Sequence, residues 1–129
     1  MKTLTLALTL LLAVPSLAQD SPRGKKKLLA LAGVLTFTIL AARYDNYETL
    51  KGIRAGVGVE GNTWLVGSHP SARALYGRDV LVIGLTTTPS VLAYVFRKWP
   101  MHYAGLTGPA TFGVKSIQGG REWAKLEKP

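Results

Sequence analysis

The chain has 129 residues, enough for one domain, and it contains no cysteine. Disulfides, thiolate metal sites and cysteine nucleophiles are therefore excluded. Sixteen Lys and Arg residues against seven Asp and Glu residues give a formal charge of +9, which suits an anionic membrane surface or a nucleic acid. The basic residues are scattered around apolar stretches and form no long tract, so they favour a membrane and argue against nucleic acid as a partner.

Residues 1–18 have the layout of a secretory signal peptide. Lys2 supplies the positive start, and Leu4–Val14 is an apolar segment of the usual length. Small residues before the junction predict cleavage after Ala18, which leaves residues 19–129 as a helical membrane domain. An uncleaved anchor helix is the alternative, and both interpretations place the start of that domain outside the cytoplasm.

The next apolar segment, Leu28–Ala42, has fifteen residues and no charge. It spans about 22 Å as a helix, which is less than the ~30 Å hydrocarbon core of a bilayer. Lys27 and Arg43 can reach the headgroups and make up part of the difference. Because the segment is apolar on every side, it predicts a membrane span, with the core helix of a soluble domain as the alternative. The polar stretch before it, Gln19–Lys27, is too short for structure of its own.

No proline interrupts the following residues, which predicts one long helix from about Lys26 to Ala55. Small and polar residues recur near the C-terminal end of this predicted helix at steps of four, three and four, which places them on one face. An acidic and an amide side chain follow just beyond. These six positions are the candidate polar contact residues: Asp45, Thr49, Gly52, Gly56, Glu60 and Asn62.

The segment Gly56–Gly61 spells GxGxxG, a dinucleotide-binding fingerprint. That motif needs a preceding strand and a following helix, whereas a helical pattern precedes it here. We therefore expect no nucleotide or other cofactor, and assign these glycines to a turn of the backbone. His69 lies beside Ser68 with no acidic group near it in sequence, so no catalytic residue and no metal site is predicted.

The second half of the chain predicts further helices. A capping residue and a proline at Ser68–Ser71 favour a helix start, with Ala72–Tyr76 as a short surface helix. Val80–Phe96 is a second candidate span, bracketed by charged residues that suit two membrane interfaces. The polar sequence at its centre, Thr86–Ser90, predicts a proline kink whose polar patch faces protein or, alternatively, a substrate.

Pro100 is expected to end that helix. Tyr103–Ile117, rich in glycine, then completes the bundle as a third helix or lies re-entrant. Gln118–Gly120 is predicted to break the chain before a charged tail, Arg121–Pro129. The basic residues on the two sides of the predicted spans do not favour either membrane orientation.

The pattern across Asp45–Asn62 resembles a family of small bacterial integral membrane proteins of unknown function. Members of that family carry an Asp, a Thr four residues later, a Gly-rich step and a Glu-x-Asn-Pro element between hydrophobic helices. The family's proline is replaced by Thr63 here. The resemblance implies a helical membrane protein and no established activity. The matching positions are Asp45, Thr49, Gly56, Glu60 and Asn62.

Together these features predict an all-α fold, a small helical membrane bundle with two or three spanning or interfacial helices after an N-terminal signal segment. They predict insertion into the inner (cytoplasmic) membrane through the secretory pathway. The expected partners are the lipid bilayer and another membrane protein or a second copy of the chain.

Three functions follow from these features. The first is a structural or partner-binding role, with no enzymatic activity identified. The second is a membrane-embedded enzyme or carrier that uses Asp45 and Glu60, with His102 near them. The third is a secreted, basic, soluble protein in which the apolar segments form a buried core.

Overall fold

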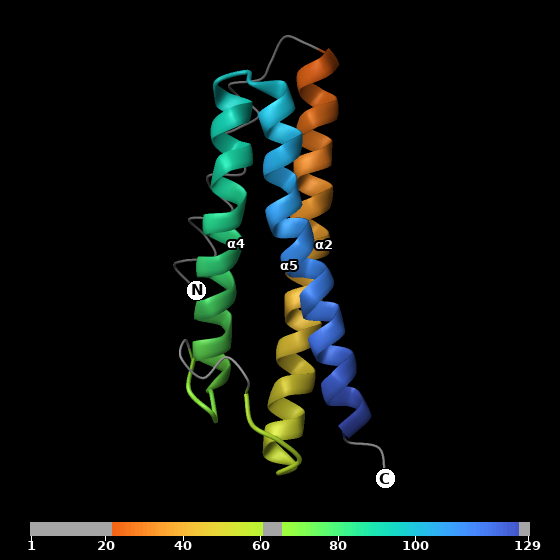
Figure 1. The fold of residues 1–129 in the computed structure, drawn as a ribbon, viewed down its shortest axis with the longest axis vertical. Helices are drawn as coiled ribbons and strands as arrows, with labels where there is room; N and C mark the ends of the chain where they lie inside the picture. The colour runs from red at the N-terminus through yellow and green to blue at the C-terminus, as the bar shows by residue number, and fades with distance from the viewer. Residues whose placement is uncertain (1–21, 61–65, 127–129) are drawn as a thin grey trace.

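The computed structural model describes residues 22–60 and 66–126, and within these ranges the chain forms helices and no strand. Three long helices lie side by side along one axis: α2 (Pro22–Arg54), α4 (Ala72–Val95) and α5 (Trp99–Leu126) (Figure 1). α4 runs antiparallel to the other two. The all-α prediction is confirmed, whereas the predicted signal peptide and the candidate residue Asn62 lie outside the described residues.

α2 agrees with the predicted long helix but begins earlier, at Pro22. The stretch that we expected to lack structure, Gln19–Lys27, is therefore helical from Pro22 onward. Proline suits a first turn because the N–H group that it lacks would have no partner within the helix there.

The predicted glycine turn is present at the other end of α2. Gly56 adopts a left-handed conformation with φ 72°, which costs glycine little. Its N–H donates to the Ile53 carbonyl, and the Val57 N–H donates to the Gly52 carbonyl, both at 3.1 Å. This pair of bonds is the Schellman motif that closes many helices. Gly56 therefore belongs to the turn and not to the helical face on which its spacing had placed it.

α4 is one continuous helix, so the prediction of a short surface helix at Ala72–Tyr76 separate from Val80–Phe96 is wrong. Ser71 caps its start, accepting a hydrogen bond from the Ala74 N–H at 3.2 Å. Gly77 lies between the two predicted segments, and a glycine in a helix interior costs only about 1 kcal/mol. That cost is too small to end a helix whose other residues pack against neighbours.

The polar patch at the centre of α4 faces protein in part. Thr87 and Ser90 are buried, whereas Thr88 and Pro89 are exposed. The Thr88 hydroxyl donates to the Gly84 carbonyl one turn earlier at 2.8 Å, which satisfies a hydroxyl that faces outward.

α5 also runs on past its predicted end, and the break expected at Gln118–Gly120 is wrong. The glycines there allow two helices to come close. A Cβ on Gly120 would lie 2.6 Å from Tyr44 Cε1 of α2, and one on Gly119 would lie 2.8 Å from the Asp45 carboxylate. Since α5 is a continuous helix alongside the other two, the re-entrant alternative is also excluded.

Further glycines along α5 bring it against both of the other helices. A Cβ on Gly105 would lie 2.6 Å from the Ser90 nitrogen of α4, and one on Gly113 would lie 2.7 Å from Phe37 of α2. Between these positions the Thr38 hydroxyl donates to the Pro109 carbonyl at 2.9 Å and ties α2 to α5. Small residues and hydrogen bonds of this kind are typical of helix packing in membranes.

The interior of the bundle is unusually polar. Its largest apolar cluster consists of Leu31, Leu35 and Leu106 with a few partly buried neighbours. Large apolar side chains point outward along all three helices, among them Leu40, Leu85 and Met101. Polar and charged residues instead occupy much of the interior: Lys27, Thr38, Asn46, Thr49, Glu60, Arg78, Asp79, Thr87, Ser90, His102 and Ser116.

Of the described helices, only α2 is long and apolar enough to cross a membrane, over a stretch within Arg23–Arg54. Only 28% of that stretch is buried inside the bundle. The second span predicted at Val80–Phe96 is not supported by this measure.

Acidic residues gather at one end of the axis. The end that contains the start of α2 and the α4–α5 connection has only basic charged residues in its described part: Arg23, Lys25, Lys26, Lys27, Arg97 and Lys98. The other end contains every carboxylate in the described ranges: Asp45, Glu48, Glu60, Asp79 and Glu122. It also contains eight basic residues: Arg43, Lys51, Arg54, Arg73, Arg78, Lys115, Arg121 and Lys125.

The close approach of α4 and α5 makes a direct prediction. Gly105→Ala places a methyl group against the Ser90 backbone, so we expect the free energy of unfolding to fall by about 1–3 kcal/mol through overpacking. Gly84→Ala is the matched control, because no atom lies within 4 Å of its added Cβ. Thermal unfolding of both variants in detergent, followed by circular dichroism, would refute close packing if Gly105→Ala were as stable as Gly84→Ala.

Candidate functional site

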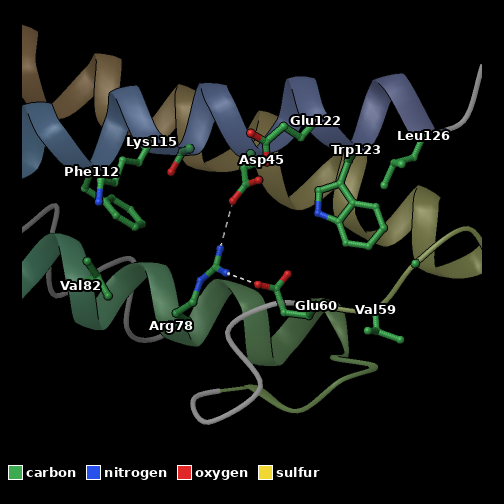
Figure 2. Close-up of a pocket in the computed structure, with 13 residues that line it drawn as sticks. Asp45, Val59, Glu60, Arg78, Val82, Phe112, Lys115, Glu122, Trp123 and Leu126 are labelled. Atoms are coloured by element: carbon green, nitrogen blue, oxygen red, sulfur yellow. Dashed lines mark hydrogen bonds and ion pairs between the residues drawn. The ribbon is translucent and has the colours of Figure 1, made fainter.

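A buried arginine, Arg78, is the centre of the candidate site (Figure 2). Its Nη2 lies 3.0 Å from Asp79 Oδ1 and 3.4 Å from Asp45 Oδ2, and its Nη1 lies 3.6 Å from Glu60 Oε1. Nη2 also donates to Asn46 Oδ1 at 3.0 Å, and Nε donates to Asp79 Oδ1 at 3.1 Å. One guanidinium is thus surrounded by three carboxylates and an amide.

Three parts of the chain supply this cluster. Asp45 and Asn46 come from the last turns of α2, Arg78 and Asp79 come from the second turn of α4, and Glu60 comes from the segment after α2. The Asn46 amide donates to Asp79 Oδ2, so both polar atoms of this fully buried side chain are satisfied. The cluster therefore fixes how α2 and α4 meet at this end of the bundle.

A hydrogen bond of the backbone holds the segment that carries Glu60 in place. The Glu60 N–H donates to the Ser68 carbonyl at 3.0 Å, which closes the chain between α2 and α4. Only 8% of the Glu60 side chain is exposed, which is little for a carboxylate.

Burial changes the acidity of the aspartates, which lie just outside the apolar segments Leu28–Ala42 and Val80–Phe96. Burial raises the pKa of Asp45 from 3.8 to about 6. The Arg78 charge opposes this rise, and the neighbouring carboxylates Glu60 and Asp79 add to it. Burial also raises the pKa of Asp79, against the opposing effect of Arg78. The Arg78 charge therefore offsets only part of the cost of burying the Asp45 and Asp79 carboxylates.

A cavity of about 560 Å³ lies beside the cluster, between α4 and the C-terminal half of α5. Asp45, Glu60 and Arg78 line one side of it, and Trp123 projects into it from α5 (Figure 2). The Trp123 ring also rests on Gly52, where a Cβ would lie 2.4 Å from its edge. The cavity has the volume of an ordinary small-molecule site and a mixture of charged, aromatic and aliphatic walls.

The structure brings together some of the predicted contact residues and separates others. Asp45 and Glu60 meet at Arg78, while Thr49 is buried and Gly52 lies beneath the Trp123 ring. Gly56 lies in the turn, with nothing within 4 Å of an added Cβ. The GxxxG spacing of Gly52 and Gly56 therefore does not form a helix-packing motif.

His102 does not join this site, and the expectation that it lies near Asp45 and Glu60 is wrong. It is fully buried at the opposite end of the bundle, where Nδ1 lies 3.0 Å from the Ser90 carbonyl and Nε2 lies 3.2 Å from the Lys27 carbonyl. Lys27 in turn places its ammonium 3.8 Å from the centre of the Trp99 ring. This second polar centre links all three helices.

Sequence reasoning missed Asn46, and a signal for it was present. The buried stripe of α2 runs through Leu35, Thr38, Ala42, Asn46 and Thr49 at steps of three or four, as the inner face of a helix should. Following that stripe downward from the apolar segment predicts Asn46 as an inward-facing residue.

Arg78 and Asp79 were interpreted as the charged border of a membrane span, which does not distinguish a solvated arginine from a buried one. Trp123 belongs to the segment Arg121–Pro129, which the sequence predicts as a charged tail. Both assignments depend on which helix lies opposite, and no local pattern carries that information.

Within the described residues, no group of three or more His, Asp or Glu side chains is arranged to hold a metal ion. The comparisons with known protein families, curated proteins and solved structures found no match for this chain. The resemblance of Asp45–Asn62 to a membrane protein family stays a prediction.

Removing the central charge tests the cluster. Arg78→Met keeps most of the side-chain volume but leaves the buried carboxylates of Glu60 and Asp79 and the partly buried Asp45 without this cation, so we expect the free energy of unfolding to fall by about 3–5 kcal/mol. Arg73→Met is the matched control, because Arg73 is exposed on the same helix. Equal melting temperatures for the two variants would show that the cluster does not hold the fold.

The raised pKa of Asp45 predicts a pH dependence. The folded chain keeps this proton up to about pH 6, whereas the unfolded chain releases it near 3.8, so the folded state binds more protons between these values. The free energy of unfolding should therefore decrease as pH rises from about 4 to 6, by about 3 kcal/mol for a shift of this size, and then level off.

Asp45→Asn should flatten this profile and raise stability at pH 7. The exposed carboxylate Glu122 provides the control, since Glu122→Gln should retain the wild-type slope. Melting temperatures between pH 4 and 8 measure both effects, and a wild-type stability that increases over pH 4–6 would contradict the assignment.

Proposed function

We propose that the protein is a small integral membrane protein that binds a partner at the end of the bundle occupied by the Arg78 cluster. The observation that carries this proposal is the distribution of side chains, with polar groups inside and large apolar groups outside. Exposed apolar surface on this scale favours contact with lipid. We further propose insertion into the inner membrane through the secretory signal predicted at residues 1–18.

The burial of α2 supports lipid contact over a soluble core. The core helix of a soluble protein is mostly buried, whereas most of the apolar stretch of α2 lies outside the bundle interior. Leu40 is 63% exposed, and Leu85 of α4 is 66% exposed. We assign the span to Leu28–Ala42, beyond which the last turns of α2 and the Arg78 cluster lie towards the membrane surface.

The partner-binding role rests on the cavity beside the cluster. Buried charge is costly, and a bundle of this size needs none of it for a stable core. Asp45 and Glu60 face a cavity that is open to one side, which suits a site that receives a ligand more than a sealed ionic core.

A carrier is the second candidate function, and one observation favours it. Asp45 and Glu60 share one cavity next to a buried cation, and ionisable groups in such places often take part in proton or solute movement. Proteoliposomes that contain a pH-sensitive dye distinguish the two roles. A proton flux that Asp45→Asn abolishes would favour the carrier, and the absence of any flux would favour binding alone.

Membrane fractionation tests the proposed location. We expect the full chain to stay in the membrane pellet after an alkaline carbonate wash and to require detergent for release. Leu40→Arg should reduce the membrane-bound fraction, since it adds a cation to the apolar segment. The cost should lie below the ~2.5–3.5 kcal/mol that insertion scales give at the centre of a span, because Leu40 is close to the end of the segment.

Tyr47→Arg is the matched control, because Tyr47 is equally exposed but lies beyond the apolar segment. Release of the wild-type chain by carbonate, or an unchanged membrane fraction for Leu40→Arg, would favour the secreted soluble protein instead.

A further inference from the structure

The cavity beside Arg78 is short of positive charge. Asp45, Glu60 and Glu122 line it, Asp79 pairs with Arg78, and the described lining residues include two cations, Arg78 and Lys115. The formal charge of these six side chains is therefore negative, and two of the carboxylates, Glu60 and Asp79, are buried. A ligand that adds positive charge would relieve this excess.

Arg78, the buried cation of this cavity, already has partners. The Nε, Nη1 and Nη2 atoms of Arg78 all lie against carboxylate or amide oxygens. An anionic ligand would have to displace those oxygens from the guanidinium. A cationic ligand would instead approach the carboxylates of Asp45 and Glu60, each of which can accept several hydrogen bonds.

The remaining walls of the cavity are apolar and aromatic. Phe112 and Val82 lie at the side towards the middle of the bundle, and Trp123, Leu126 and Val59 lie at the other side (Figure 2). Such walls offer nothing to a hydrated inorganic ion but bury an alkyl group well. The Trp123 ring can also attract a cation that lies over its face.

We propose that this cavity binds an organic ammonium cation with an apolar body, whose ammonium group meets Asp45 and Glu60 and whose alkyl part lies along Trp123 and Leu126. The ligand is either a soluble alkylamine or the headgroup of an amine-bearing lipid. In the lipid case the phosphate can approach Lys115, which forms no ion pair with any described residue. This inference deepens the binding role proposed above.

The test uses the full chain in dodecyl maltoside micelles, which carry no amine and no charge. n-Hexylammonium chloride is titrated while the melting temperature is recorded, with n-hexanol and sodium hexanoate as controls of equal chain length. We expect saturable stabilisation by hexylammonium alone. Equal stabilisation by hexanol or hexanoate would overturn the proposal.

Variants locate the binding site. Glu60→Gln should weaken hexylammonium binding at least tenfold, and Glu122→Gln should weaken it severalfold without disturbing the fold, since Glu122 is exposed. Glu48→Gln is the matched control: Glu48 lies at the same end of the bundle, pairs with Lys51 and does not line the cavity. If Glu60→Gln fails to fold, Glu122→Gln decides the question, and wild-type affinity in that variant would refute the site.

Mixed micelles distinguish the two sources of the ammonium group. If the ligand is a lipid, phosphatidylethanolamine but not phosphatidylglycerol should stabilise the protein and reduce the apparent affinity for hexylammonium. If the ligand is soluble, neither lipid should alter the hexylammonium titration. Binding of a lysine-containing peptide in place of hexylammonium would contradict the proposal and point to a protein partner.

Carbonate fractionation does not depend on this cavity, so the two results can fail separately. If the chain stays in the membrane but does not bind hexylammonium, only the proposed ammonium ligand is refuted. If the chain binds hexylammonium but is released by carbonate, only the proposed membrane location is refuted.

Discussion

The burial of one guanidinium is the interaction on which this fold depends. Arg78 cannot leave water without acceptors, and the acceptors come from the exit of α2, from Asp79 beside it and from the segment at Glu60. The need to provide acceptors for the N–H groups of Arg78 therefore sets how α2 and α4 align and where Glu60 lies. The same contacts place three carboxylates around one guanidinium. The requirement that orders this end of the bundle therefore also gives the cluster an excess of acidic groups.

α5 imposes the second constraint, because glycines occupy its contact positions with the other two helices. Gly105, Gly113 and Gly120 leave room for Ser90, Phe37 and Tyr44 respectively, so the helices approach until their backbones nearly touch. In the bilayer that we propose, no hydrophobic effect would drive the helices together, and close packing with hydrogen bonds would replace it. The hydrogen bond from Thr38 to the Pro109 carbonyl and the contacts of the His102 ring with the Ser90 and Lys27 carbonyls join the described helices in this way.

The sequence predicts the helices of this protein better than it predicts their partners. The all-α class, the long helix ending near Ala55 and the glycine turn after it follow from composition, proline positions and local backbone chemistry. The role of a glycine is harder to predict, because Gly56 forms a turn whereas Gly120 forms a contact between helices. The local sequence of a glycine does not show whether a second helix lies opposite it. The sequence likewise identifies Asp45 and Glu60 as candidates but does not show that Arg78 of another helix lies between them.

The carboxylates gather at one end of the bundle, and this gives the molecule a chemical direction. In the described ranges one end carries six basic residues and no acidic one, whereas the other carries every carboxylate together with eight basic residues. Turning the bundle over in the proposed bilayer therefore exchanges a cationic surface for one of mixed charge. Two neighbouring copies would also differ in energy with their relative direction. A parallel pair sets two cationic ends side by side, where they repel, whereas an antiparallel pair places each cationic end beside the mixed charges of its neighbour.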